Sequence, residues 1–134
     1  MHRLGTTVAI AATACAVSGC GGHDERDVQQ VVRDFATAVN TRDGKTFCTK
    51  LTTRSYLERV TAAKGPTAVK QCETQINALR LQEKYKVVSF QKTKVDGDDA
   101  TVTAVLLSEG QRRPQVFRLH REDGRFRLTS GATN

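Results

Sequence analysis

The chain has 134 residues and a formal net charge of +7, with 38% hydrophobic and 26% charged residues. These values are typical of one ordinary globular domain, and they exclude a disordered chain and an integral membrane protein. The positive charge favours anionic partners such as phospholipid headgroups, wall polymers or nucleic acid. Aromatic residues are few and tryptophan is absent, which argues against a surface that stacks bases or sugars.

The first residues have the pattern of an export signal. Arg3 gives a basic start, and residues 4–17 follow without a charge and with many Ala, Val and Ile. This stretch is too short for a membrane-spanning helix, which needs about 20 apolar residues. It ends in Val17-Ser18-Gly19-Cys20, a run that resembles the lipobox of bacterial lipoproteins.

The resemblance to a lipobox implies cleavage before Cys20 and a lipid on its thiol. It therefore implies a signal peptide over residues 1–19, a lipidated tether over residues 20–23 and a domain over residues 24–134. Because two acyl chains such as palmitate hold a protein firmly to a bilayer, we expect the protein at the cell membrane, on its extracytoplasmic face. The alternative is an ordinary secretory signal with a chance cysteine, and Cys15 is expected to leave with the leader.

The domain begins with a segment whose apolar residues have helical periodicity. Asp24 is predicted to cap a first helix, in which apolar residues recur every three or four positions. These residues are Val28, Val31, Val32, Phe35 and Val39.

Shorter helices are predicted to follow. A second helix covers residues 45–51, and Thr52 or Thr53 can cap a further turn or two. Gly65-Pro66 suits the start of another helix, because proline is favoured at the first helical position. The apolar face of that helix contains Val69, Cys72, Ile76 and Leu79.

After Lys84 the hydrophobic period changes to that of strands. Residues 85–95 predict a first strand with Val88 and Phe90 on one face. Residues 100–108 are apolar in both phases, which predicts a central strand covered on two sides. Two further strands alternate, and their inward residues are Phe117, Leu119, Phe126 and Leu128. The sequence therefore predicts an α+β fold, with N-terminal helices packed on a curved antiparallel sheet of about four strands.

Two cysteines, Cys48 and Cys72, remain after the leader and the lipobox. An exported pair meets an oxidising compartment, so we expect a disulfide that closes a loop of about 25 residues. A catalytic or redox thiol is the alternative, but the chain has no Cys-x-x-Cys pair. No histidine falls at ligand spacing from these cysteines, so we expect neither a metal nor another cofactor.

A long first helix, shorter helices and then antiparallel strands are similar to the nuclear-transport-factor-2-like (SnoaL-like) family. The local resemblance is the run Val31-Val32-Arg33-Asp34-Phe35-Ala36-Thr37-Ala38-Val39-Asn40, followed by Asp43. The run Phe47-Cys48-Thr49-Lys50-Leu51-Thr52, with its partner cysteine on a later helix, also resembles secreted lipoprotein versions from actinobacteria. The resemblance implies a cone whose concave side receives the first helix. We find no sign of the short hairpin that the family often inserts among its helices, so a helix-covered sheet without a cone pocket is the competing structure.

This family contains isomerases, dehydratases and hydrolases as well as binding and dimerisation modules, so the resemblance does not choose among functions. Its enzymes place a carboxylate inside the cone. The inward positions predicted here are apolar, and the acids fall at helix ends and in turns. His120 has no apparent buried acid partner. We therefore assign no catalytic residue.

The expected function is a non-catalytic binding or interaction module for a hydrophobic small molecule, a lipid or an envelope partner. The alternative is an enzyme of the same fold, isomerase- or dehydratase-like, that acts on a hydrophobic substrate. Sheet-face dimerisation in the family makes a homodimer a further alternative. The residues expected to line a cavity are Val32, Phe35, Val39, Ile76, Phe90 and Phe117.

The last quarter of the chain is rich in arginine. Strand alternation puts Arg118, Arg125 and Arg127 on the outward side of a hairpin. Because an export signal separates the protein from nucleic acid, the expected anionic contact is the headgroup layer of the membrane. A solvated face with Glu122 and Asp123 as counter-charges is the alternative.

Overall fold

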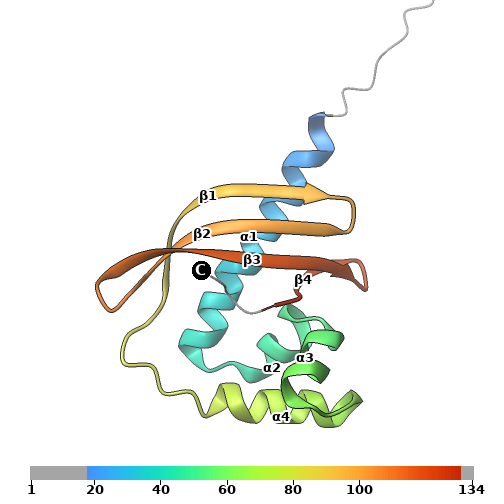
Figure 1. The fold of residues 1–134 in the computed structure, drawn as a ribbon, viewed down its shortest axis with the longest axis vertical. Coiled ribbons are helices and arrows are strands. Elements are labelled where there is room, and N and C mark those ends of the chain that lie inside the picture. The colour runs from blue at the N-terminus through green and yellow to red at the C-terminus, as the bar shows by residue number, and fades with distance from the viewer. Residues whose placement is uncertain (1–17, 131–134) are drawn as a thin grey trace, which may run out of the picture.

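The computed structural model of the protein describes residues 18–130, with side chains from Gly22 onward. Helices come first and strands second, in the order that the sequence predicts (Figure 1). The helical half contains α1 (Ser18–Thr41), α2 (Gly44–Thr46), the π-helical turn η1 (Phe47–Leu51), α3 (Arg54–Thr61) and α4 (Gly65–Asn77). The second half contains β1 (Lys86–Asp96), β2 (Asp99–Ser108), β3 (Gln111–Glu122) and β4 (Arg125–Leu128). None of the helices within residues 18–130 is long and apolar enough to cross a bilayer.

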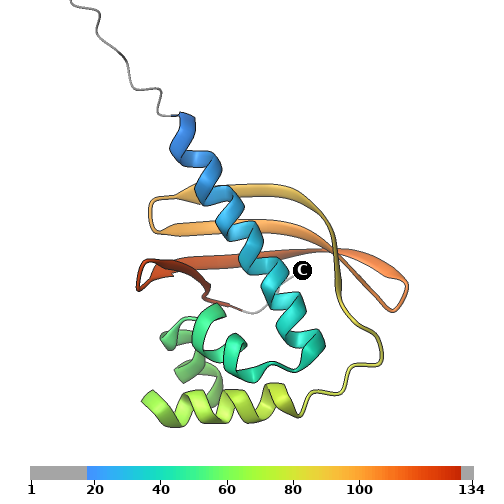
Figure 2. The same ribbon diagram turned by 180° about the vertical axis from the view of Figure 1, so that it is seen from behind.

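The strands form one curved antiparallel sheet in the order β1-β2-β3-β4, so each strand pairs with its neighbour in sequence. α1 lies across one face of this sheet (Figure 2). The opposite face carries no helix of the described chain (Figure 1). The short helices α2, η1, α3 and α4 lie beyond the β4 side of the sheet. The predicted α+β architecture, helices packed on a four-stranded antiparallel sheet, is confirmed.

α1 packs on the sheet through the apolar face that its periodicity predicts. Val28 and Val32 are completely buried in one cluster with residues of β2 and β3. The predicted cap at Asp24 is wrong, because α1 begins at Ser18. Asp24 lies within the helix, and its Oδ1 atom lies 3.5 Å from Nη2 of Arg121. The backbone of residues 20–23, for which the sequence predicted a tether, is helical and continues directly into the domain.

The core consists of two apolar clusters. The sheet cluster fills the space between α1 and the strands and contains Val28, Val32, Ala100, Val102, Ala104, Leu106, Phe117, Leu119, Phe126 and Leu128. The helical cluster contains Ala38, Val39, Phe47, Cys48, Leu51, Leu57, Ala68 and Cys72. Phe35 packs against both, since its ring centroid lies 5.4 Å from that of Phe117 and 5.7 Å from that of Phe47.

β1 departs from the predicted alternation. Val87 and Phe90 both pack against the sheet cluster, opposite Leu106 and Ala104 of β2. Register shifts follow Val87 and Phe90, and each leaves one extra residue in β1. Such bulges bend a strand and change the phase of its side chains. The prediction that Val88 shares a face with Phe90 is therefore wrong, because Val88 is the extra residue of the first bulge.

β2 is the central strand, but one of its faces is open. Its buried residues are Ala100, Val102, Ala104 and Leu106. The residues between them stay partly or largely exposed, because the face that they occupy carries no described helix. The predicted two-sided cover of this strand is wrong. β2 has apolar residues in both phases because its open face still carries Val105 and Leu107.

The two edges of the sheet differ. Along β4, Thr52 forms a parallel bridge with Leu128, and the amide of Thr53 donates to the Leu128 carbonyl at 2.9 Å. Along β1, the described chain adds no further strand. Lysines and bulges commonly protect an open edge against pairing with another chain, and β1 has both.

We expect Phe35→Ala to lower the free energy of unfolding by about 3 kcal/mol, because a buried phenylalanine truncated to alanine costs about 3–5 kcal/mol and Phe35 is partly exposed. Urea denaturation of both proteins measures this difference. Val60→Ala on α3 is the control, since Val60 is 50% exposed and should change stability by less than about 0.5 kcal/mol. Equal midpoints for Phe35→Ala and the wild type would show that the two clusters do not depend on this ring.

Candidate functional site

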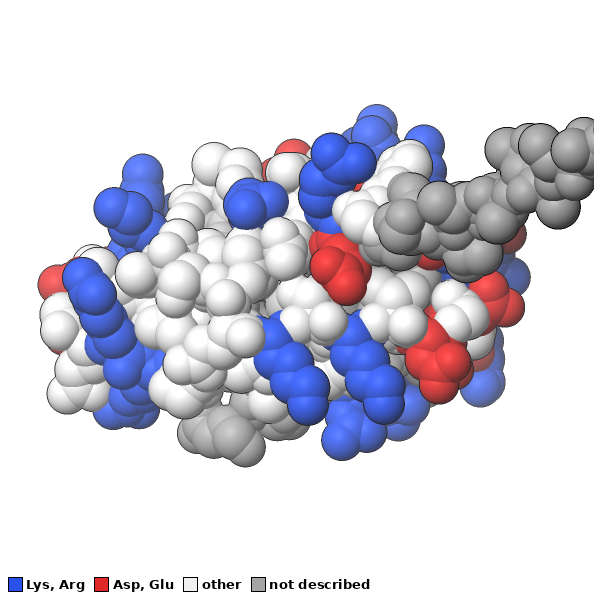
Figure 3. Space-filling view, turned by 90° about the horizontal axis from the view of Figure 1, so that it is seen from above, with Lys and Arg blue, Asp and Glu red and all other residues white. Residues whose placement is uncertain are grey.

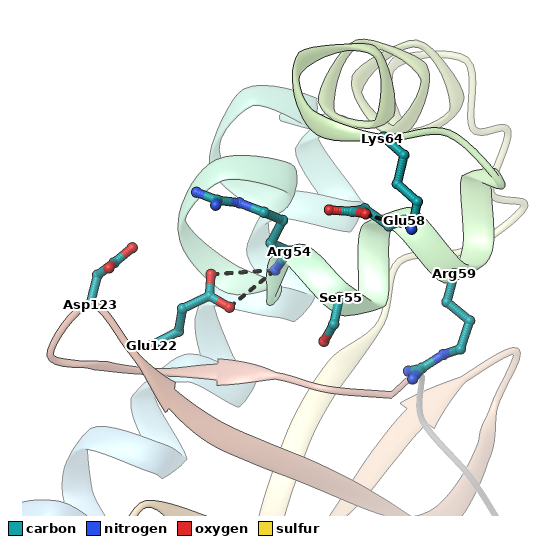
Figure 4. A pocket seen from close by; sticks show the side chains of 7 residues that line it. All are labelled: Arg54, Ser55, Glu58, Arg59, Lys64, Glu122 and Asp123. Atoms are coloured by element: carbon teal, nitrogen blue, oxygen red, sulfur yellow. Dashed lines mark hydrogen bonds and ion pairs between the residues drawn. The ribbon is translucent and has the colours of Figure 1, made fainter.

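The described residues form a surface cleft of about 540 Å³ between α3 and the turn that joins β3 to β4 (Figure 4). Charged residues of both signs and one serine line it: Arg54, Ser55, Glu58, Arg59, Lys64, Glu122 and Asp123. The first five come from α3 and the loop that follows it, and the last two come from the end of β3 and the turn.

The cleft depends on how α3 begins. Of the two predicted caps, Thr53 is the one that caps this helix, and its Oγ1 atom accepts a hydrogen bond from the Tyr56 amide at 3.2 Å. The carboxylate of Glu122 accepts the Arg54 amide at 3.2 and 3.3 Å (Figure 4). A carboxylate is favourable there, because the amides at a helix start carry partial positive charge. The carboxylate of Glu122 therefore occupies the start of α3.

Four other cleft residues, Ser55, Glu58, Arg59 and Lys64, are also engaged within the chain. Lys64 Nζ lies 3.0 Å from Glu58 Oε2, and Arg59 donates to the Thr129 carbonyl at 2.6 Å. The hydroxyl of Ser55 lies 3.3 Å from that of Thr53. An activated serine needs a base within hydrogen-bond reach, and the hydroxyl contact of Ser55 is with another hydroxyl. The cleft offers polar binding groups of both signs.

The six residues predicted to line a cavity fall into both core clusters. Val32 and Phe117 are fully buried in the sheet cluster, where Phe90 packs at the periphery. Val39 and Ile76 belong to the helical side of the core. The structure brings Phe35 into ring contact with Phe117, so these side chains fill the interior where they meet. None of the six lines the cleft of Figure 4.

The three arginines predicted to contact an anionic surface have different surroundings. Arg118 is exposed on the open face of β3. Arg125 is exposed and lines a smaller cleft that also includes Asp27 and Asp34 of α1. Arg127 is half-buried and donates to the Thr49 carbonyl of η1. Its guanidinium therefore helps to join β4 to the helical half.

His120 has an acid partner that the sequence reasoning missed. Its Nδ1 atom lies 2.7 Å from Oδ1 of Asp99, and both side chains are exposed, at 48% and 77%. Asp99 is the first residue of β2 and pairs directly with His120 of β3. The pairing register of the β2–β3 hairpin is the signal that would have predicted this pair.

The predicted disulfide between Cys48 and Cys72 is confirmed. The two sulfur atoms are 1.98 Å apart, the Cα atoms are 6.0 Å apart, and both residues are buried. The bridge joins η1 to α4. The lipobox prediction is untested, because residues 1–17 and the side chain of Cys20 lie outside the described part of the chain. Among the residues that the structure describes, no three or more His, Cys, Asp or Glu side chains are grouped to hold a metal ion.

Asp43 lies where the chain leaves α1 for α2. Its Oδ1 atom accepts the Thr46 amide at 3.1 Å and caps α2. Hydrogen bonds from the Thr46 side chain and backbone lower the pKa of Asp43 below 3.8, and the nearby Lys50 and Lys45 add to this shift. The carboxylate form of Asp43 therefore stabilises the start of α2, which connects α1 to η1.

The sequence matches no protein-family model and no curated protein. A solved structure with a similar backbone is a de novo designed protein of the nuclear-transport-factor-2 (NTF2) fold. It is 17% identical in sequence, the match covers 79% of this chain and 84% of that chain, and the TM-score is 0.46.

Reduction of the Cys48–Cys72 disulfide should lower the free energy of unfolding by about 3 kcal/mol, because the bridge limits the entropy of the unfolded chain. Guanidinium denaturation with and without a reducing agent measures the change. The Cys48→Ala/Cys72→Ala protein is the control, and its midpoint should match that of the reduced wild type. An unchanged midpoint after full reduction would contradict this expectation.

Asp43→Ala should lower stability at pH 7, and the deficit should shrink in acid. The folded-state pKa of Asp43 lies below its value of 3.8 in the unfolded chain. Its stabilisation is therefore complete above pH 3.8 and is lost as the pH falls through the folded-state pKa. Thermal midpoints between pH 2 and pH 7 test this. Asp43→Asn is the control, because asparagine keeps the capping oxygen without the charge. A deficit that stays constant down to pH 2 would refute the role of the carboxylate.

Proposed function

We propose that the protein is a lipoprotein anchored through Cys20 to the extracytoplasmic face of the cell membrane. Its NTF2-like α+β domain is a non-catalytic interaction module for an envelope partner. The run Val17-Ser18-Gly19-Cys20 supports the anchor, and the preceding uncharged stretch supports export.

The observation that carries this proposal is the buried disulfide between Cys48 and Cys72. Structural disulfides persist in oxidising compartments and are rare in the cytosol. The bridge and the export signal come from separate parts of the chain, and both favour a location outside the cytoplasm. Such a location also separates the protein from nucleic acid, so its positive charge serves some role other than nucleic-acid binding.

The described interior supports an interaction module more than an enzyme. Its buried residues are apolar except for Thr52 and Thr53. The Thr52 hydroxyl donates to the Phe47 carbonyl at 3.0 Å, and the Thr53 hydroxyl caps α3. Both are therefore used to hold the backbone. General acid–base catalysis needs an ionisable group positioned at the reacting atoms. None of the buried residues within the described chain has an ionisable side chain.

Ring contacts also favour a partner on the surface over a ligand in the core. Phe35 touches Phe117 on one side and Phe47 on the other, so apolar side chains occupy the space beneath α1. The surface instead presents an open sheet face and clefts with charged linings. These are features with which an envelope protein can form polar contacts.

The anchor is tested by expression of the full chain in a bacterial host that is fed an alkyne analogue of palmitate. We expect a mature N-terminal peptide that begins at Cys20 and carries the label. Cys20→Ala should abolish both the label and the cleavage, because the thiol accepts the lipid. Cys15→Ala is the matched control and should leave both unchanged. Cleavage at another residue with an unmodified Cys20 would overturn the proposal.

A further inference from the structure

The direction of α1 determines which side of the domain faces the anchor. α1 continues without a break from Ser18 into the core, and Val28 is completely buried. At 1.5 Å per helical residue, the backbone of Cys20 lies about 12 Å along the axis from Val28. The start of α1 projects past β1, on the side away from α3 and α4 (Figures 1 and 2). If Cys20 is lipidated, as proposed above, the membrane therefore lies on the β1 side.

Contacts between α1 and β1 define one side of this helix. Gln29 donates from Nε2 to the Thr93 hydroxyl at 3.0 Å, and the Arg33 guanidinium lies 4.8 Å from the centre of the Phe90 ring. Arg26 lies one helical turn before Gln29 and is exposed, as is Arg33. The side of α1 that runs along β1 thus carries two arginines.

Three of the four acidic residues of α1 lie on its other side. Asp24 pairs with Arg121, and Asp27 and Asp34 line a cleft with Arg121 and Arg125. Apart from Glu25, the acids of α1 therefore lie toward the β3–β4 turn, and its Arg26 and Arg33 lie toward β1.

β1 itself adds three exposed lysines. Lys86, Lys92 and Lys94 are exposed on this strand, whose outer edge pairs with no other strand of the described chain. We call the five residues Arg26, Arg33, Lys86, Lys92 and Lys94 the β1 surface. A view from this side shows basic side chains along both margins of a largely uncharged band, with acidic side chains between and beside them in one half of the view (Figure 3).

Acidic groups near this surface are fewer and partly engaged. Glu25 of α1 and Asp96 of β1 are exposed there. At the β1–β2 turn, Oδ1 of Asp98 lies 3.4 Å from Nε of Arg121, and Asp99 pairs with His120. The β1 surface therefore keeps a positive excess.

We infer that the β1 surface lies against the anionic phospholipid headgroups of the membrane that holds the anchor. The inference rests on the proposed lipidation, because the anchor puts this side of the domain next to the bilayer. Charges on exposed groups act over a Debye length of about 10 Å at 0.1 M salt, and the anchor keeps the β1 surface near that range. Anionic headgroups attract basic residues held there.

The test uses the lipoprotein isolated from host membranes and reconstituted into two kinds of vesicle. One contains phosphatidylcholine alone, and the other also contains about 30 mol% phosphatidylglycerol, a level that provides a strongly negative surface. A water-soluble acetylating reagent then modifies the lysines, and mass spectrometry gives the rate at each one. Lys45, Lys50 and Lys70 are internal controls, because they are exposed on α2, η1 and α4, away from β1.

We expect Lys86, Lys92 and Lys94 to react at least about threefold more slowly on the anionic vesicles, while the control lysines react equally on both. Salt at 0.5 M should remove the difference, since it screens exposed charges. Equal rates on the two vesicles, or slowing that includes the control lysines, would overturn the inference. If soluble polyphosphate protects the β1 lysines and anionic vesicles do not, the occupant is an anionic polymer and the membrane is excluded.

A second measurement separates this inference from the anchor. If the isolated protein carries no lipid, its sedimentation with anionic vesicles is compared among the wild type, Lys86→Gln/Lys92→Gln/Lys94→Gln and Lys45→Gln/Lys50→Gln/Lys70→Gln. The two variants lose the same charge. We expect the β1 variant alone to bind about tenfold more weakly, in line with the attraction of each basic residue to an anionic surface. Equal binding by the two variants refutes the contact between the β1 surface and the headgroups. Absence of a lipid on Cys20 refutes the proposed anchor.

Discussion

The structure depends on the position of Phe35 between two apolar clusters. Its ring contacts Phe117 in the sheet and Phe47 in η1, so one side chain of α1 fixes the distance between the strands and the short helices. Aromatic pairs in tilted and edge-on contact are favourable beyond the area that they bury. The disulfide then holds η1 to α4 within the helical cluster. These two connections join α1, β3, η1 and α4. The cleft, the covered β4 edge and the β1 surface include α3, β4 and β1, which pack against or pair with those four elements.

Electrostatic contacts complement this core where α1 meets the strand ends. Arg121 pairs with Asp24 of α1 and with Asp98 of the β1–β2 turn, and its guanidinium lies 4.2 Å from the centre of the Phe126 ring. One arginine thus connects a helix, a turn and the last strand. Salt bridges at partly exposed sites contribute little each, so Arg121 chiefly sets geometry. Asp24 lies on the side of α1 that faces Arg121, whereas Arg33 lies on the side that faces β1.

The sequence predicted the features that follow from apolar periodicity and failed where backbone register decides. Val28 and Val32 repeat at helical spacing, and Phe117 and Leu119 alternate as in a strand, so their burial followed from a simple pattern. The paired cysteines were also predictable, because an exported pair favours one bridge. The face of Val88 was not, since two bulges shift β1 in a way that leaves no compositional mark. The Asp99–His120 pair needed the hairpin register, and the extension of α1 to Ser18 passes through glycines that usually weaken a helix.

The pairing of Thr52 with Leu128 has a consequence for the order in which the protein folds. The residues that link η1 to α3 complete their hydrogen bonds only with the last strand, and Arg59 likewise donates to the carbonyl of Thr129. Because a chain is synthesised from its N-terminus, these partners are made after the helices that they complete. Domains generally fold as units, and an unpaired strand edge is prone to wrong association until its partner arrives. The β3 edge and the start of α3 therefore lack these hydrogen bonds until residues 125–129 have been synthesised, which makes the pairing of β4 a late step in folding.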